Sequence, residues 1–81
     1  MASQTISLRK LMVRQKAKIV SLKASGELGR RIRDMGLLPG VEIQVLGRAP
    51  LQDPVALRVH DFTLTLRNNE ADRILVQPLQ D

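Results

Sequence analysis

The side chains that could support acid–base, nucleophilic or metal chemistry are few and scattered in this chain of 81 residues. There is no cysteine, the only histidine is His60, and the eight acidic residues are spread along the chain. A catalytic site would need a nucleophile beside a base, two positioned carboxylates or a bound metal. The closest acidic pair, Glu70 and Asp72, falls in one predicted helical turn, where capping and solubility account for both residues. The sequence therefore predicts a protein that is not an enzyme.

The sequence also predicts no cofactor and no selective metal site. His60, beside Asp61 at a predicted hairpin tip, could ligate a metal only weakly. A site selective for ferrous iron or zinc needs several convergent ligands, and the chain has no second imidazole and no thiolate.

Basic residues are concentrated near the N-terminus. Residues 1–33 hold nine basic residues and one acidic residue, for a net charge of +8, whereas residues 34–81 carry a net charge of −3. This asymmetry favours a nucleic acid, the cytoplasmic leaflet of a membrane or an acidic protein face, and solubility alone is the alternative. Single-strand binders stack bases on aromatic side chains, yet Phe62, the only aromatic residue, falls at a predicted core position. P-loop, dinucleotide-binding and helix-turn-helix motifs are absent, so nucleic acid is the weaker candidate.

Length and composition indicate one small domain without linkers or repeats. No run of strongly apolar residues exceeds three, and the N-terminus lacks a signal-peptide pattern. We therefore expect a cytosolic protein with loose ends around an ordered core.

One helix is predicted, over residues 26–36. Leu28, Ile32 and Met35 recur at the spacing of a single apolar face, Ser25 can cap the N-terminus, and Gly36 suits a left-handed C-terminal stop. Residues 38–41 then fit a type II turn, with proline second and glycine third.

Short strands surround this helix. Apolar residues or their alternation with polar ones predict strands at residues 16–22, 41–46, 55–60, 62–67 and 74–76. A hairpin turn falls at His60 and Asp61, residues 68–73 suggest one helical turn with an asparagine cap, and Pro78 should stop the last strand. The fold class expected is mainly β, a small, partly open five-stranded barrel with one inserted α-helix.

Two segments resemble the FeoA family of ferrous iron transport accessory proteins. They are RRIRDMGLLPGVEI at residues 30–43 and RAPLQDP at residues 48–54, followed by LTLR at residues 64–67. The resemblance covers about residues 6–78 of the single domain formed by residues 1–81. It implies an SH3-like barrel and a cytosolic partner of the ferrous iron permease FeoB, whose cytosolic part carries a GTPase domain. Gln52 and Asp61 depart from the family pattern, because glycine is usual at the first position and frequent at the second.

The resemblance implies that the protein docks on a FeoB-type permease and modulates its GTPase or transport activity. No small-molecule substrate is expected, and the membrane would be reached only peripherally, through the permease. The same barrel follows DNA-binding and dimerisation domains in iron-dependent repressors, so a nucleic-acid-associated or corepressor-like module is the alternative.

We expect the docking surface to combine helix arginines with the apolar corner after the helix, because interfaces often join a charged rim to a hydrophobic anchor. Its predicted residues are Arg30, Arg31, Arg33, Leu37, Leu38, Pro39 and Arg48. The residues predicted to shape the turns are Gly36, Pro39, Gly40, Pro50 and Pro54.

Overall fold

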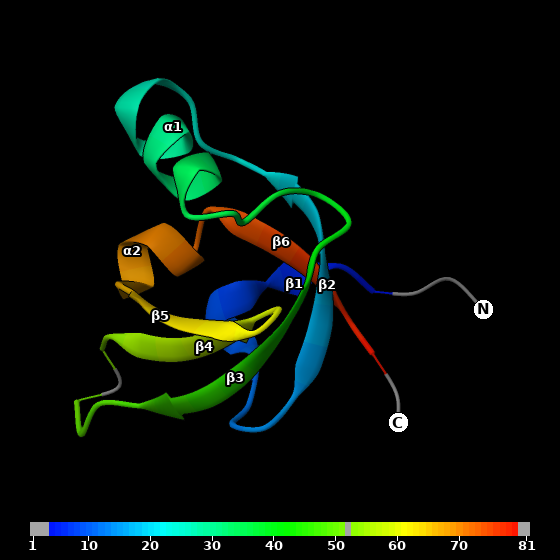
Figure 1. Cartoon of the computed structure of the whole chain (residues 1–81), viewed down its shortest axis with the longest axis vertical. Coiled ribbons are helices and arrows are strands. Elements are labelled where there is room, and N and C mark those ends of the chain that lie inside the picture. The colour runs from blue at the N-terminus through cyan, green and yellow to red at the C-terminus, as the bar shows by residue number, and fades with distance from the viewer. Residues whose placement is uncertain (1–3, 52, 80–81) are drawn as a thin grey trace.

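A computed structural model describes residues 4–51 and 53–79, and within these residues six strands form one antiparallel sheet. The strands are β1 (Ile6–Ser7), β2 (Lys16–Leu22), β3 (Glu42–Arg48), β4 (Val55–Val59), β5 (Phe62–Leu66) and β6 (Ile74–Pro78). Three short helices complete the fold: the 3-10 helix η1 (Leu8–Lys10), α1 (Gly26–Asp34) and α2 (Asn68–Ala71). Figure 1 shows α1 at one end of the long axis, with the connection from η1 to β2 and the β3–β4 loop at the other.

The mainly β, SH3-like architecture confirms the predicted fold class, with one strand more than expected. The spatial order of the strands is β1-β6-β2-β3-β4-β5, so the curled sheet has β1 and β5 at its two edges. The additional strand, β1, pairs Ile6 with Val76 and is too short to produce an alternating pattern in the sequence. Strand β6 continues to Pro78, opposite Ala17, instead of stopping before the proline.

The core forms inside the curled sheet from alternate residues of the strands. The fully buried side chains of β4 are Val55, Leu57 and Val59, as the alternation predicts. Phe62 was expected in this core, and that prediction is wrong, because 43% of the side chain is exposed. It is the first residue of an edge strand, and its ring lies at the rim of the core, over Gly36.

Helix α1 confirms the predicted apolar face. Ile32 is fully buried, and Leu28 and Met35 pack against the core. Ser25 occupies the N-cap position, although its side chain makes no capping hydrogen bond. Gly29 allows the helix to approach the preceding chain closely, since a Cβ there would lie 2.5 Å from the carbonyl oxygen of Ala24.

Two predicted turn details are wrong. His60, not Asp61, adopts the left-handed conformation at the β4–β5 turn, with φ of +56°. Helix α2 has Arg67 rather than an asparagine at its N-cap, and the Glu70 carboxylate accepts a hydrogen bond of 3.0 Å from the Arg67 N–H. Glu70 takes over the capping role because its side chain folds back from the third helical position.

Candidate partner-binding surfaces

An exposed apolar corner follows helix α1. The Val41 N–H donates to the Leu38 carbonyl at 3.1 Å and Gly40 has φ of +93°, which confirms the predicted turn. Leu38 and Phe62 are each 43% exposed, and Pro39 is also exposed. We call these three residues, Leu38, Pro39 and Phe62, the Leu38–Phe62 corner.

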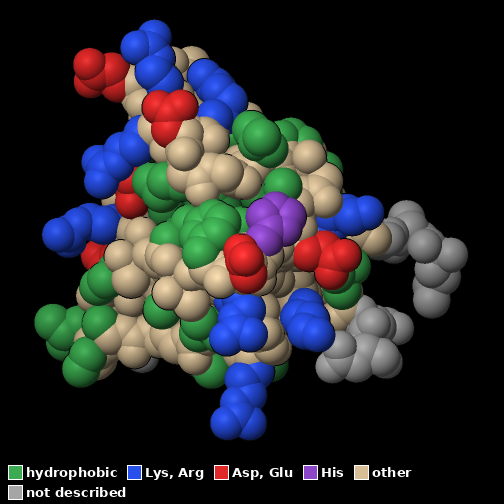
Figure 2. Space-filling model, viewed as in Figure 1, with side chains coloured by type: hydrophobic (Ala, Val, Ile, Leu, Met, Phe, Trp, Pro, Cys, Tyr) green, Lys and Arg blue, Asp and Glu red, His purple; other side chains and the backbone are tan. Residues whose placement is uncertain are grey.

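Gly36 lies next to both parts of this corner. The Leu38 N–H donates to the Gly36 carbonyl at 3.1 Å, while a Cβ built on Gly36 would lie 3.7 Å from Phe62 Cζ. Figure 2 shows hydrophobic side chains gathered beside the single histidine on this face. The corner therefore joins residues from the turn after α1 and from β5.

Leu37 does not belong to this surface. It was predicted as a docking residue, but its side chain is fully buried. Gly36, with φ of +89°, reverses the chain so that Leu37 packs back under the helix, and its N–H faces the Ile32 carbonyl at 3.4 Å. Leu37 is therefore a core residue that supports the corner from below.

The three arginines of α1 do not form a single patch. At about 100° per residue, Arg31 and Arg33 project from nearly opposite sides of the helix, and Arg30 projects away from the buried Ile32. Arg31 Nε lies 3.4 Å from Oε2 of Glu70, a carboxylate with only 5% of its side chain exposed. Arg31 therefore compensates a buried charge, whereas Arg30 and Arg33 are exposed and form no ion pair with a described carboxylate.

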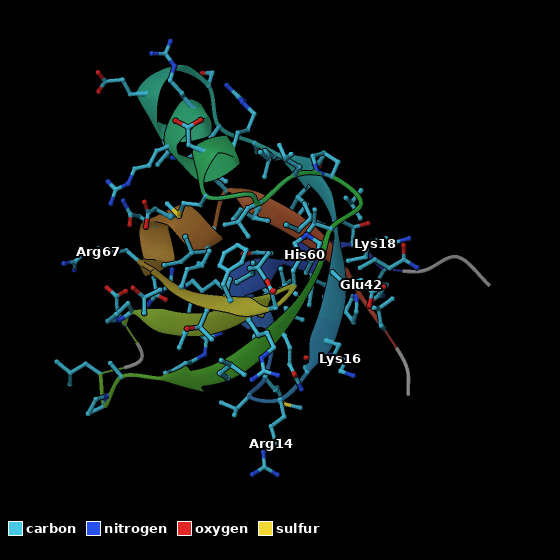
Figure 3. All side chains as sticks on the ribbon, viewed as in Figure 1. Arg14, Lys16, Lys18, Glu42, His60 and Arg67 are labelled. Carbon is cyan, nitrogen blue, oxygen red and sulfur yellow. The ribbon has the colours of Figure 1, made fainter. Side chains whose placement is uncertain are left out.

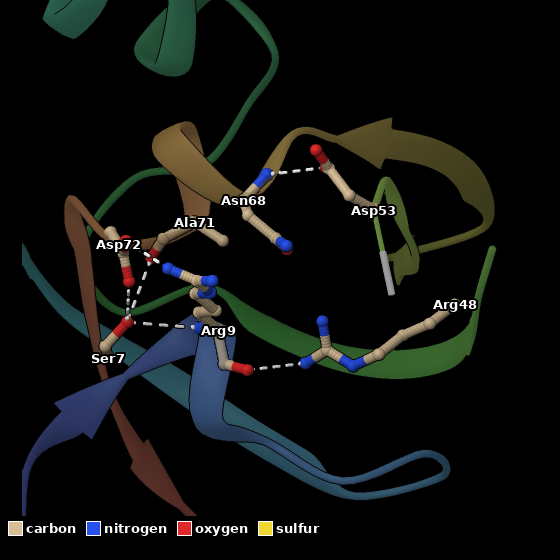
Figure 4. A network of polar contacts seen from close by, with 7 residues as sticks. All are labelled: Ser7, Arg9, Arg48, Asp53, Asn68, Ala71 and Asp72. Carbon is tan, nitrogen blue, oxygen red and sulfur yellow. Dashed lines mark hydrogen bonds and ion pairs between the residues drawn. The ribbon is translucent and has the colours of Figure 1, made fainter. Parts of the chain in front are cut away.

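Arg48 has a structural contact of its own. Its Nη2 donates to the backbone carbonyls of Arg9 at 2.7 Å and Leu11 at 2.9 Å, linking β3 to η1. Figure 4 shows this link beside a second set of contacts, in which Arg9 pairs with Asp72 at 2.9 Å. Arg48 therefore links β3 to η1 through two backbone carbonyls and not through a carboxylate.

Two predicted turn prolines flank the β3–β4 loop. The Ala49 N–H donates to the Pro54 carbonyl at 3.0 Å, and Pro50 is exposed. Gln52, the predicted departure from the family pattern, lies outside the described residues.

The sequence interpretation missed an exposed apolar turn between η1 and β2. Met12 is 71% exposed and Val13 is 50% exposed, and both line an open hollow of about 380 Å³ together with Arg9, Leu11, Arg48 and Asn68. The only signal in the sequence was the basic character of the first 33 residues.

Neither a membrane-spanning helix nor a metal-ligating cluster occurs within residues 4–51 and 53–79. No helix there is long and apolar enough to cross a bilayer. No group of three or more His, Cys, Asp or Glu side chains within residues 4–51 and 53–79 could hold a metal ion. His60 lines an open concavity of about 500 Å³ with neighbours that include Glu42, Lys16 and Arg58.

Comparison with known proteins decides the family, because the FeoA domain matches residues 6–78. This chain belongs to the FeoA family. FeoA proteins are accessory proteins of ferrous iron transport and not a family of enzymes.

One relative of this FeoA chain contains a second functional unit. The chain is 37% identical over 70 residues to an Fe(2+) transport protein A/Fe(2+) transporter FeoB fusion protein of Porphyromonas gingivalis. The match covers 86% of this chain but only 8% of the fusion protein.

Solved structures support the fold. A FeoA-like protein from Clostridium acetobutylicum superposes with a TM-score of 0.90 at 37% identity, covering 100% of this chain and 93% of that one. FeoA of Stenotrophomonas maltophilia, complexed with zinc and described as a procaryotic SH3 domain protein, gives 0.76 at 26% identity, with coverages of 93% and 91%. A manganese-dependent transcriptional repressor gives 0.86 at 16% identity, covering 98% of this chain and 44% of that one, and shows a shared fold alone.

Proposed function

We propose that this FeoA protein docks on a FeoB-type ferrous iron permease and modulates its GTPase or transport activity. The supporting observation is the Porphyromonas gingivalis fusion protein, in which a segment 37% identical to this chain is joined to FeoB. Fusion holds two units at a high effective concentration, which is useful when the separate proteins must associate. The protein works by binding from the cytoplasmic side, without a catalytic site or a small-molecule substrate.

The Leu38–Phe62 corner is the docking anchor in this proposal. It exposes a leucine on the turn after α1 and an aromatic ring at the start of β5, and interface hot spots are commonly large apolar side chains held in place. Exposed Arg30 and Arg33 supply positive charge on α1, the helix that leads into this corner, as the polar rim of an interface does. Arg31 and Leu37 are excluded because the fold uses both of them.

Binding to purified FeoB-type permease in detergent tests the proposal. The double variant Leu38→Ser with Phe62→Ser should bind the permease about tenfold or more weakly, because it removes both apolar anchors. Met12→Ser with Val13→Ser is the matched control, since it removes two exposed apolar side chains from a different region and should leave the affinity unchanged.

The rate of GTP hydrolysis by the permease, measured with and without the protein, tests the second half of the proposal. A rate that changes with wild-type protein but not with the Leu38→Ser, Phe62→Ser variant would support modulation through the corner. Absence of any binding between the folded wild-type protein and the permease would overturn the proposal.

A further inference from the structure

A second surface lies at the end of the molecule opposite α1. It consists of exposed apolar and basic residues from the η1–β2 connection, the start of β2 and the β3–β4 region. We call it the Met12–Arg14 edge; its exposed residues are Met12, Val13, Arg14, Lys16 and Leu51, and Arg48 beside them is half-buried. Figure 1 shows the η1–β2 connection and the β3–β4 loop both at the lower end of the barrel, the loop to the left of the connection.

The apolar part of this edge is unusually exposed for a domain with so few residues to form a core. Leu51 is 89% exposed, Met12 is 71% exposed and Val13 is 50% exposed. These residues come from two connections that the Arg48 side chain ties together through the Arg9 and Leu11 carbonyls. Exposed apolar side chains that adjoin one another and are rimmed by polar groups mark contact sites for proteins or membranes, and Met12 and Val13 form such a pair.

The charged part of the edge is almost entirely positive. Arg14 and Lys16 are exposed, and in Figure 3 both lie in the lower part of the molecule, with Arg14 extending away from the barrel. The sequence contains no acidic residue before Glu27. Asp53 in the β3–β4 loop is the one acid of that loop, and its carboxylate accepts a hydrogen bond of 2.9 Å from the Asn68 N–H.

Arg14 occupies a backbone position that suits glycine. The Gln15 N–H donates to the Met12 carbonyl at 3.0 Å, and Arg14, the third residue of this turn, has φ of +76°. An arginine in this conformation is strained, and glycine would relieve the strain. The fold therefore carries an exposed cation directly after Met12 and Val13, at the cost of a strained backbone at Arg14.

We propose that the Met12–Arg14 edge binds the surface of an anionic phospholipid bilayer. Met12, Val13 and Leu51 enter the interfacial region, while Arg14 and Lys16 contact lipid phosphates, a combination typical of peripheral membrane proteins. A nucleic acid fits less well, because base stacking requires aromatic side chains and Phe62 lies in the Leu38–Phe62 corner instead. This binding would be direct, in contrast to the sequence-based expectation of contact only through the permease.

The proposal does not depend on docking to the permease, because different residues carry the two contacts. The edge lies at one end of the long axis and α1 lies at the other, so a protein seated on a bilayer through the edge would leave α1 pointing into solution (Figure 1). The Leu38–Phe62 corner shares no residue with the edge and would remain free for a partner.

Co-sedimentation with phospholipid vesicles tests this inference without the permease. The wild-type protein should bind vesicles of phosphatidylcholine mixed with phosphatidylglycerol and should not bind vesicles of phosphatidylcholine alone. Added salt should weaken the binding, because salt screens the attraction between the arginines and lysines and the lipid phosphates. Failure of the folded protein to bind the anionic vesicles at low salt would overturn the proposal.

Matched variants then locate the contact. Arg14→Glu with Lys16→Glu should lower the vesicle partition coefficient about tenfold or more, since each basic residue near the bilayer contributes about fivefold. Arg30→Glu with Arg33→Glu changes the net charge equally on α1 and should have a much smaller effect. Equal losses in both variants would show attraction by net charge alone and would overturn the assignment to the edge.

The apolar contribution has its own control. Met12→Ser with Val13→Ser should weaken vesicle binding without changing the charge, whereas Leu38→Ser with Phe62→Ser should not. Arg14→Gly should also weaken vesicle binding, and a free energy of unfolding at or above that of wild type would show that this loss does not result from misfolding. Binding of a single-stranded oligonucleotide through Arg14 and Lys16, with no vesicle binding, would identify a nucleic-acid surface and overturn the proposal.

Discussion

Two turns of the same geometry lie in opposite halves of this molecule, and their residues differ in an informative way. In the turn of residues 38–41, Gly40 takes the left-handed third position with φ of +93°. In the turn of residues 12–15, Arg14 takes the equivalent position with φ of +76°. The first residue suits the backbone, and the second is strained by it.

The charges of the two halves differ in the same sense. Arg31, on α1, faces the buried carboxylate of Glu70 at 3.4 Å and so helps to compensate that buried charge. Arg14 forms no ion pair with a described acid and extends into solution. Arg31 and Gly40 in the α1 half therefore stabilise the structure. In the opposite half Arg14 carries backbone strain and a charge that forms no ion pair with a described acid, although Arg48 there links β3 to η1.

The largest expected effect concerns the glycines of the α1 half. Gly36→Ala with Gly40→Ala should lower the free energy of unfolding by about 2–3 kcal/mol, since a Cβ at each positive φ costs about 1 kcal/mol or more. The cost at Gly40 is conformational, because a Cβ there would meet no atom within 4 Å. Urea denaturation measures the change. Gly47→Ala is the control, because a Cβ at Gly47 would also meet no atom within 4 Å but Gly47 has no positive φ. A comparable loss of stability in this variant would show that positive φ does not explain the effect.

A smaller effect should distinguish the two kinds of arginine. Arg31→Glu should lower the free energy of unfolding by about 1 kcal/mol, because it places a second carboxylate beside buried Glu70, with the cost reduced by solvent around Arg31. Arg14→Glu should leave the stability within about 0.5 kcal/mol of wild type, as surface changes usually do. Thermal and urea denaturation of the two variants provide the test, and equal destabilisation would contradict it.

The smallest effect should have the opposite sign. Arg14→Gly should raise the free energy of unfolding by about 0.5 kcal/mol, because relief of roughly 1 kcal/mol of strain exceeds the added flexibility of glycine in the unfolded chain. Introducing glycine should thus stabilise the turn of residues 12–15, whereas replacing glycine should destabilise the turn of residues 38–41. A clear loss of stability in Arg14→Gly, measured by urea denaturation, would show that the arginine side chain supports the fold.

Local patterns were sufficient for the elements that depend on neighbouring residues. The apolar face of α1, the turn at Pro39 and Gly40, and the alternating strands all follow from spacings of a few residues, and the structure confirms them. Strand β1 was missed because two residues carry no period.

The surface was harder to predict because it depends on contacts between distant parts of the chain. The buried Glu70 that engages Arg31 comes from α2, and the carbonyls that hold Arg48 come from η1. Phe62 has the correct alternation for the core but lies on an edge strand, which only the order of the strands reveals. Arg14 adopts a left-handed conformation that glycine favours, so the residue types of this turn did not predict it.

The pairing of β1 with β6 also has a mechanical consequence. Ile6 lies opposite Val76 and Ser7 lies opposite Leu75 in antiparallel register, so the first and last strands leave the barrel side by side at the same end. Tension applied between the chain before β1 and the chain after β6 would break the hydrogen bonds of this pair one at a time, instead of loading them all together. A weak pull would therefore peel β1 away first. Because the sheet continues beyond this edge as β6-β2-β3-β4-β5, most of the barrel would remain intact.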